Sequence, residues 1–128
     1  MKTDPDLRKS GEQKITEILG QTAADVEASL GDMAPDLATY VLEVIYGQIY
    51  QSSTLDSRTR QIVTVASLAT LGTAGPQLRT HLGGALRCGV SRAELVEIMM
   101  QLVPYVGVAA AINGVAACRE VFAAADEK

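Results

Sequence analysis

The amino-acid sequence predicts an all-α protein, on two observations. Apolar residues recur at spacings of three and four positions along most of the chain, which places them on one face of a helix. The composition is 48% hydrophobic with no Trp and a single Phe, so the core is aliphatic and Ala-rich, which favours helix packing over sheets. We expect a single domain over residues 1–128 with about six helices, its core in residues 36–124 and peripheral N-terminal helices in residues 4–31.

Three helices are predicted in the N-terminal part of the chain. A polar helix over residues 4–19 is followed by a short helix over residues 23–30, and a glycine ends each of them. Pro35 suits the first turn of a stronger helix over residues 36–50, because proline lacks only an N–H that has no helical partner there. The apolar residues of this third helix form a helical stripe: Leu37, Val41, Leu42, Val44, Ile45 and Ile49.

The remaining helices carry clearer end signals. Asp56 is a suitable N-cap for a helix that runs to about Leu71 and is apolar nearly all round. A second helix is expected over residues 76–88, and Gly89 is placed to end it. The run Ser91-Arg92-Ala93-Glu94 is a capping box, the strongest local signal in the chain.

The helix that follows the capping box belongs to a long uncharged segment. We expect this helix to kink or end at Pro104, and a last helix to cover roughly residues 108–124. Residues 98–118 carry no charge, but Gln101, Pro104, Asn113 and many small residues argue against a membrane span. We therefore expect a buried helix pair that a partner subunit covers.

Two features of the sequence predict a cytoplasmic protein. The N-terminus MKTDPDLRKSGEQK lacks the apolar stretch of a signal peptide. The two cysteines, Cys88 and Cys118, are isolated in the sequence, which is typical of buried thiols in a reducing compartment.

A basic stretch stands out in this acidic chain of formal net charge -4. Between Ser57 and Ala93 there is no Asp or Glu, yet the stretch includes Arg58, Arg60, Arg79, Arg87, Arg92 and the single histidine, His81. An acidic protein repels nucleic acid at long range, so we expect no nucleic-acid partner. A small anionic ligand fits better, because guanidinium groups match the planar geometry of carboxylates.

His81 lies on a lane of mostly small side chains on its predicted helix. The residues aligned with it are Gln77, Gly84, Ala85 and Cys88. Either the lane leaves room for a ligand beside the imidazole, or His81 forms a hydrogen bond across a close helix contact; the sequence leaves both interpretations open. Arg58 and Arg60 likewise are either ligand-binding groups or solvated surface residues.

Other chemistry has no sequence signal here. The chain has no P-loop, GxGxxG motif, nucleophile elbow or metal-spaced ligand cluster, so an enzyme of this sequence is expected to need neither metal nor nucleotide. Glu43 and Glu97 are carboxylates on apolar-rich helices, and the sequence does not tell whether either faces a pocket.

Three stretches together resemble the carboxymuconolactone decarboxylase family of the alkyl-hydroperoxidase-D-like superfamily. They read LDSRTRQIVTVASLATLG, QLRTHLGGALRCGVSRAELVEIMMQLVPYVG and AAxxGVAACREVF, and the match covers about residues 40 to 123. The resemblance implies an all-helical subunit that assembles into a homo-oligomer, a hexamer or trimer.

The superfamily has a thiol branch and a decarboxylase branch. The thiol branch uses Cys-x-x-Cys-x-x-x-His with a glutamate on the preceding helix. At the corresponding positions this chain has Ala74, Gln77, His81 and Gln61, so the resemblance disfavours thiol peroxidase or disulfide reductase activity. It favours the decarboxylase branch, a cofactor-independent carboxy-lyase of aromatic-compound catabolism.

The decarboxylase branch implies roles for the basic residues. Arg58, Arg60 and Arg79 are expected to bind substrate carboxylates, and His81 to stabilise charge and deliver a proton. Two family features differ: residues 50–55 read YQSSTL instead of Trp-x-Arg-Pro-Gly-Leu, and residues 107–111 read GVAAA instead of Gly-x-Pro-Ala-Ala. A related lyase or isomerase acting on another carboxylated lactone or polyketide, and a non-catalytic oligomeric ligand-binding protein, therefore remain alternatives.

Overall fold

The first two helices begin and end at local signals. In the computed structural model, which describes all 128 residues, α1 spans Pro5–Leu19 and α2 spans Ala23–Leu30. The side chain of Asp4 caps α1, and Thr22 opens α2 with a capping box. Gly20 ends α1 in the left-handed region, at φ 69°, where a side chain would add strain.

The third predicted helix is interrupted, so the expectation of one continuous helix over residues 36–50 is wrong. The chain forms α3 (Pro35–Thr39), a π-helical segment η1 (Tyr40–Tyr46) and a 3₁₀ turn η2 (Ile49–Gln51). The buried residues Ala38, Leu42 and Tyr46 are spaced by four, and the wider π turn keeps them on one side. Leu37 and Ile49, which the predicted stripe included, are instead about half exposed.

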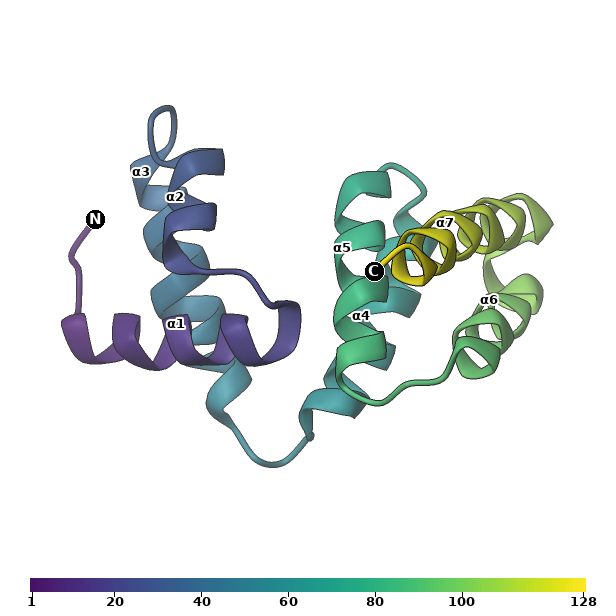
Figure 1. Ribbon diagram of the computed structural model, residues 1–128, viewed down its shortest axis with the longest axis horizontal. Coiled ribbons are helices and arrows are strands. Elements are labelled where there is room, and N and C mark those ends of the chain that lie inside the picture. Colours follow the sequence, from purple (N-terminus) through teal and green to yellow (C-terminus); the bar gives the residue numbers. More distant parts are fainter. The chain divides into compact units, whose positions relative to one another are not determined.

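Residues Met1–Leu55 form one of two units into which the contacts divide the chain. Figure 1 shows α1 crossing the α3–η1 segment, and α1 and η1 pack closely. A Cβ atom on Gly11 would lie 1.8 Å from the carbonyl oxygen of Leu42, so only glycine permits this crossing. The core of this unit is Ile15, Val26, Ala38, Leu42 and Tyr46.

Residues Asp56–Lys128 form the second unit, which has four helices. They are α4 (Ser57–Leu71), α5 (Gly75–Arg87), α6 (Arg92–Val106) and α7 (Val108–Asp126).

The predicted end signals of this second unit are confirmed at three positions. Asp56 caps α4, accepting a hydrogen bond of 2.8 Å from the backbone N–H of Thr59. Ser91 and Glu94 form the predicted capping box. At Gly89, after the end of α5, the backbone is left-handed. The helix α6 does not end at Pro104 but continues to Val106.

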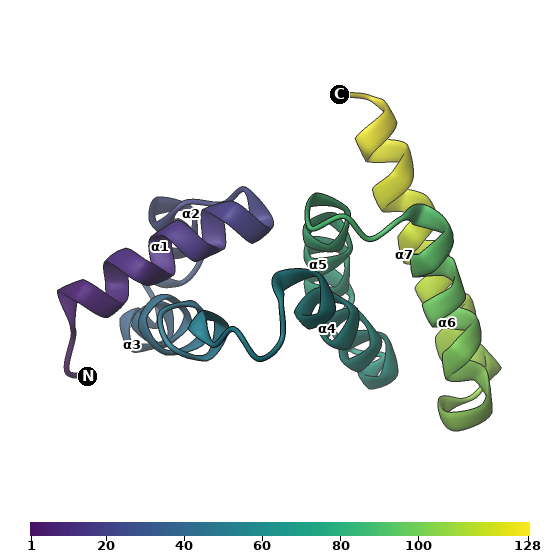
Figure 2. The same ribbon diagram turned by 90° about the horizontal axis from the view of Figure 1, so that it is seen from below.

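The four helices pack as two pairs. Figures 1 and 2 show α4 beside α5 and α6 beside α7, and α7 also packs against α5. The α6–α7 contact is close because a Cβ on Gly114 would lie 2.3 Å from the sulfur of Met99. The buried core is aliphatic, as expected: Val65, Ala69, Leu78, Leu82, Ala85, Val90, Leu95, Met99, Ala117 and Cys118.

The prediction of an all-α fold is confirmed, because the chain contains helices and no strand. By length and composition alone, α7 is the one helix apolar enough to cross a membrane. Only 22% of this apolar window is buried within the chain, and α7 packs against α5 and α6.

Candidate functional site

The pairing of α4 with α5 brings together two polar side chains of the second unit. Gln61 lies on α4 in line with Val65 and Ala69, the residues that α4 contributes to the core, and it is completely buried. His81 lies on α5 next to the buried Leu82 and is itself partly buried. A polar residue on the core side of a helix requires a partner.

Gln61 and His81 form that pair. The side-chain oxygen Oε1 of Gln61 lies 3.0 Å from Nδ1 of His81. The Gln61 amide nitrogen Nε2 is buried without a hydrogen-bond partner. Burial lowers the pKa of His81 below its usual 6.5, and no charged neighbour contributes to this change. The imidazole is therefore mostly neutral at neutral pH.

The three predicted substrate-binding arginines do not meet at one site. Arg58 forms an ion pair with Glu94 at the start of α6, and Arg79 forms one with Glu120 of α7. Arg60 is partly buried in the first turn of α4. The structure thus joins Arg58 and Arg79 to different helices and bonds neither of them to His81.

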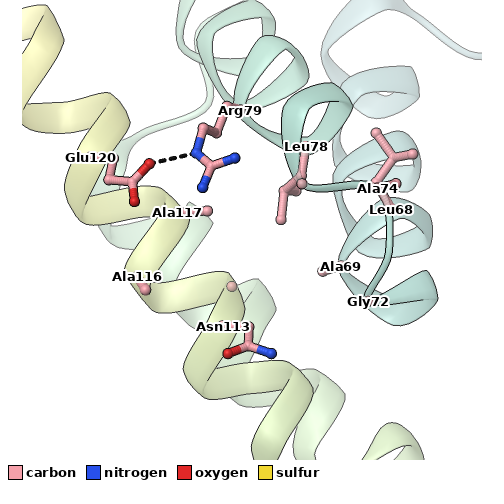
Figure 3. Close-up of a pocket in the computed structure, with 12 residues that line it drawn as sticks. Leu68, Ala69, Gly72, Ala74, Leu78, Arg79, Asn113, Ala116, Ala117 and Glu120 are labelled. Carbon is pink, nitrogen blue, oxygen red and sulfur yellow. Dashed lines mark hydrogen bonds and ion pairs between the residues drawn. The ribbon is translucent and has the colours of Figure 1, made fainter.

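Arg79 borders a cavity of about 250 Å³ between the α4–α5 pair and α7. Figure 3 shows its side chain reaching from α5 to Glu120, with Asn113 further along α7. The wall is otherwise made of small and apolar residues: Leu68, Ala69, Gly72, Ala74, Gly75, Leu78, Gly114, Ala116 and Ala117. The cavity is lined by a guanidinium, a carboxylate and a carboxamide, and the guanidinium of Arg79 is paired with the carboxylate of Glu120. His81 does not line it.

The sequence does not tell whether Glu43 or Glu97 faces a pocket, and the structure places the two carboxylates in different surroundings. Glu43 is buried in the first unit, where its Oε1 accepts a hydrogen bond from the backbone N–H of Asp4 and its Oε2 has no partner. Glu97 is exposed and borders an apolar cavity of about 400 Å³ between α4 and α6, as does Glu94. No group of three or more His, Cys, Asp and Glu side chains is placed to bind a metal.

The cysteines offer no thiol pair. Cys118 is buried, and burial raises its pKa, which favours the unreactive thiol. Cys88, at the end of α5, is partly buried, and no disulfide joins the two. We expect Cys88→Ser with Cys118→Ala to leave turnover within a few-fold, since no disulfide joins the two thiols. Loss of activity in a folded double variant would instead indicate thiol chemistry.

The lowered pKa of His81 predicts a pH dependence of stability. Its pKa is about 6.5 in the unfolded chain and lower in the folded protein, so below 6.5 the unfolded state binds more protons. The contribution of His81 to the free energy of unfolding is therefore complete above pH 6.5. It is lost as the pH falls from 6.5 towards the pKa that His81 has in the folded protein. In urea unfolding, the free energy of unfolding should fall more between roughly pH 8 and pH 5 for the wild type than for His81→Gln. Equal losses would contradict the burial of a neutral imidazole.

The sequence placed His81 correctly on its helix, and the family resemblance placed Gln61 at the position of the thiol branch's glutamate, but the hydrogen bond between the two was not predicted. Gln61 carried one available signal, because it falls four positions before Val65 and eight before Ala69 on the apolar side of α4. Glu120 and Asn113 gave no such signal, because α7 reaches Arg79 only through tertiary packing over 41 positions of sequence.

Comparison with known proteins identifies relatives over most of the chain. Residues 35–126 match the sequence model described as Carboxymuconolactone decarboxylase family. A protein of Acinetobacter baylyi named "4-carboxymuconolactone decarboxylase" is 29% identical over 120 residues, which cover 93% of this chain and 89% of the relative. A Paracoccus denitrificans protein named "Uncharacterized 15.0 kDa protein in nqo9-nqo10 intergenic region" is 28% identical, and the matched residues cover 75% of this chain and 72% of that protein's length. The family match includes the Gln61–His81 pair and the Arg79 cavity.

Proposed function

The chain belongs to the carboxymuconolactone decarboxylase family, and we propose that it is a cofactor-independent carboxy-lyase acting on a small carboxylated lactone. The observation that carries the proposal is the Gln61–His81 pair, which holds the only histidine of the chain in a partly buried position inside the family-matched region. The similarity to the Acinetobacter decarboxylase supports the same reaction class.

The proposed reaction breaks one carbon–carbon bond and forms one carbon–hydrogen bond. The substrate carboxylate leaves as CO₂, and the electron pair of the broken bond passes through the ring double bond to the lactone carbonyl. A proton added to the ring carbon next to that carbonyl then gives the enol-lactone. Because the carbonyl accepts the electron pair, the step needs no cofactor, and the protein must only orient the substrate, stabilise negative charge and supply the proton.

His81 is the proposed proton donor. Its pKa is low in the free protein because burial disfavours the charged ring. An anionic substrate beside the ring favours imidazolium, so His81 takes up a proton when the substrate binds and gives it to the carbanion after CO₂ leaves.

Arg58, Arg60 and Arg79 are the proposed carboxylate-binding groups. The ion pairs of Arg58 with Glu94 and of Arg79 with Glu120 are exposed, and exposed pairs contribute little net stability. Exchange of the glutamate for a substrate carboxylate is therefore inexpensive. The cavity beside Arg79 has a volume of about 250 Å³, and we propose it as the pocket that binds one substrate carboxylate.

The divergent sequence at residues 50–55 and 107–111 favours one further candidate, a lyase or isomerase for another carboxylated lactone or polyketide. The non-enzymatic alternative is an oligomer that binds a ligand without catalysing a reaction. The test is CO₂ release from 4-carboxymuconolactone and a matched series of carboxylated lactones, with binding measured in parallel. Turnover of one of them supports the lyase; tight binding with no chemical change across the series supports a binding protein.

We also propose that the active form is a homo-oligomer, hexameric or trimeric, in the cytoplasm. The end of α6 and the start of α7 expose large apolar side chains, including Tyr105 at 76%, Val108 at 62% and Ile112 at 61%. A second copy of the chain is the proposed cover for this surface.

This oligomer can be tested in solution. Light scattering after size exclusion should give a multiple of the 13.5 kDa chain mass. Ile112→Glu should shift the population to smaller species, because an exposed carboxylate cannot be buried in a partner's apolar surface without a large cost. A wild-type monomer at micromolar concentration would contradict the proposal.

A further inference from the structure

We propose that Gln61 is a positioning residue for His81: its carboxamide holds the imidazole in the Nδ1–H form and leaves Nε2 as the only ring nitrogen open to substrate. The role in turnover rests on the proposed function, whereas the position of the proton on the ring does not.

The hydrogen-bond geometry carries the first step. Oε1 of Gln61 lies 3.0 Å from Nδ1 of His81. A carboxamide oxygen has lone pairs and no hydrogen, so it can only accept. In the neutral ring one nitrogen donates and the other accepts, so Nδ1–H leaves the lone pair on Nε2. Nε2 has no hydrogen-bond partner among the protein groups.

The burial of Gln61 carries the second step. Its side chain is completely buried, and its amide nitrogen has no partner. An unpaired buried amide nitrogen lowers stability, so packing alone would favour methionine or leucine at this place in α4. The one polar contact that the glutamine makes is with His81, which indicates that the residue serves the imidazole rather than the core.

The neutral charge of the carboxamide carries the third step. A carboxylate at this position would stabilise imidazolium and accept its proton, whereas an amide does neither. Burial lowers the pKa of His81. Gln61 therefore fixes the ring orientation and leaves it neutral until an anion arrives at Nε2.

The single histidine makes the proposal directly measurable. In the full-length ¹⁵N-labelled protein without a histidine tag, both imidazole nitrogen resonances belong to His81. Above its pKa, the wild type should show a protonated Nδ1 and an unprotonated Nε2. Gln61→Glu should keep this arrangement and raise the pKa of His81, because a carboxylate favours imidazolium. Gln61→Met should abolish the preference for Nδ1–H.

Turnover provides the second readout. Gln61→Met should lower kcat by about 10–100-fold with little change in KM, as for other groups that orient a histidine. In a His81→Gln background the same substitution should have no further effect, because the two residues act as a unit. Gln13→Met, at an exposed position of α1, is the matched control and should change neither the ring nor the rate.

The outcomes separate the two proposals. The positioning role would be overturned if the neutral wild-type ring is protonated on Nε2. It would also be overturned if Gln61→Met leaves the preference for Nδ1–H unchanged. A loss of stability in Gln61→Met without any change in the ring or in kcat would assign Gln61 to packing and also overturn it. If the ring behaves as predicted but no carboxylated lactone is turned over, the positioning role stands and the proposed lyase function fails.

Discussion

His81→Gln should lower kcat for a carboxylated lactone by about 10²–10⁴-fold, the usual cost of losing a positioned acid or base. Glutamine approximates the size of the ring and can still form a hydrogen bond to Gln61, but it cannot carry a proton to the substrate. Steady-state kinetics give kcat and KM, and thermal unfolding with light scattering checks the fold and the assembly.

Thr80→Ala is the matched control for this variant. Thr80 precedes His81 on α5 and is exposed, and its hydroxyl bonds only the carbonyl of Pro76 one turn earlier. We expect it to retain nearly full activity. If His81→Gln instead stays within about threefold of the wild type, the histidine contributes packing and not proton transfer.

Gly11→Ala should destabilise the first unit by about 3 kcal/mol or more, the range of severe overpacking. Its Cβ would lie 1.8 Å from the carbonyl oxygen of Leu42 and 2.8 Å from the carbonyl carbon. These are backbone atoms, so no side-chain rotation relieves the clash, and α1 must move away from η1. Urea unfolding measures the loss.

Gly83→Ala provides the opposite case on α5. Nothing lies within 4 Å of a Cβ placed at Gly83, and the residue is inside a helix. Alanine there should leave stability unchanged or raise it by up to about 1 kcal/mol, because glycine is the poorer helix former. Equal stability of Gly11→Ala and Gly83→Ala would contradict the close crossing of α1 and η1.

Local signals in the sequence sufficed for most of the fold. The caps at Asp56 and Ser91 and the glycines at 20 and 89 each act within one turn of chain, so their residue types alone identify helix ends. The π-helical segment could not be predicted in this way. Its buried apolar residues, Leu42 and Tyr46, fall four apart, a spacing that an α-helical stripe also permits.

The candidate site was predictable in part for the same reason. His81 stood out as the only histidine on a lane of small residues. The partners of Arg58 and Arg79 lie 36 and 41 positions away, on helices whose contact no local pattern encodes. Gln61 lies 20 positions from His81; the family resemblance placed it at the position of the thiol branch's glutamate, but its hydrogen bond to His81 appears only once α4 and α5 are paired.

The central claim, that this protein removes CO₂ from a carboxylated lactone with proton delivery by His81, is tested most directly by one reaction in D₂O. 4-Carboxymuconolactone labelled with ¹³C in its carboxyl group is mixed with the wild-type protein and followed by NMR. We predict one labelled CO₂ per lactone consumed and one deuteron on the ring carbon next to the lactone carbonyl, with both signals nearly abolished in His81→Gln. Release of CO₂ at the wild-type rate by His81→Gln, or a lactone that binds and stays unchanged, would contradict the account.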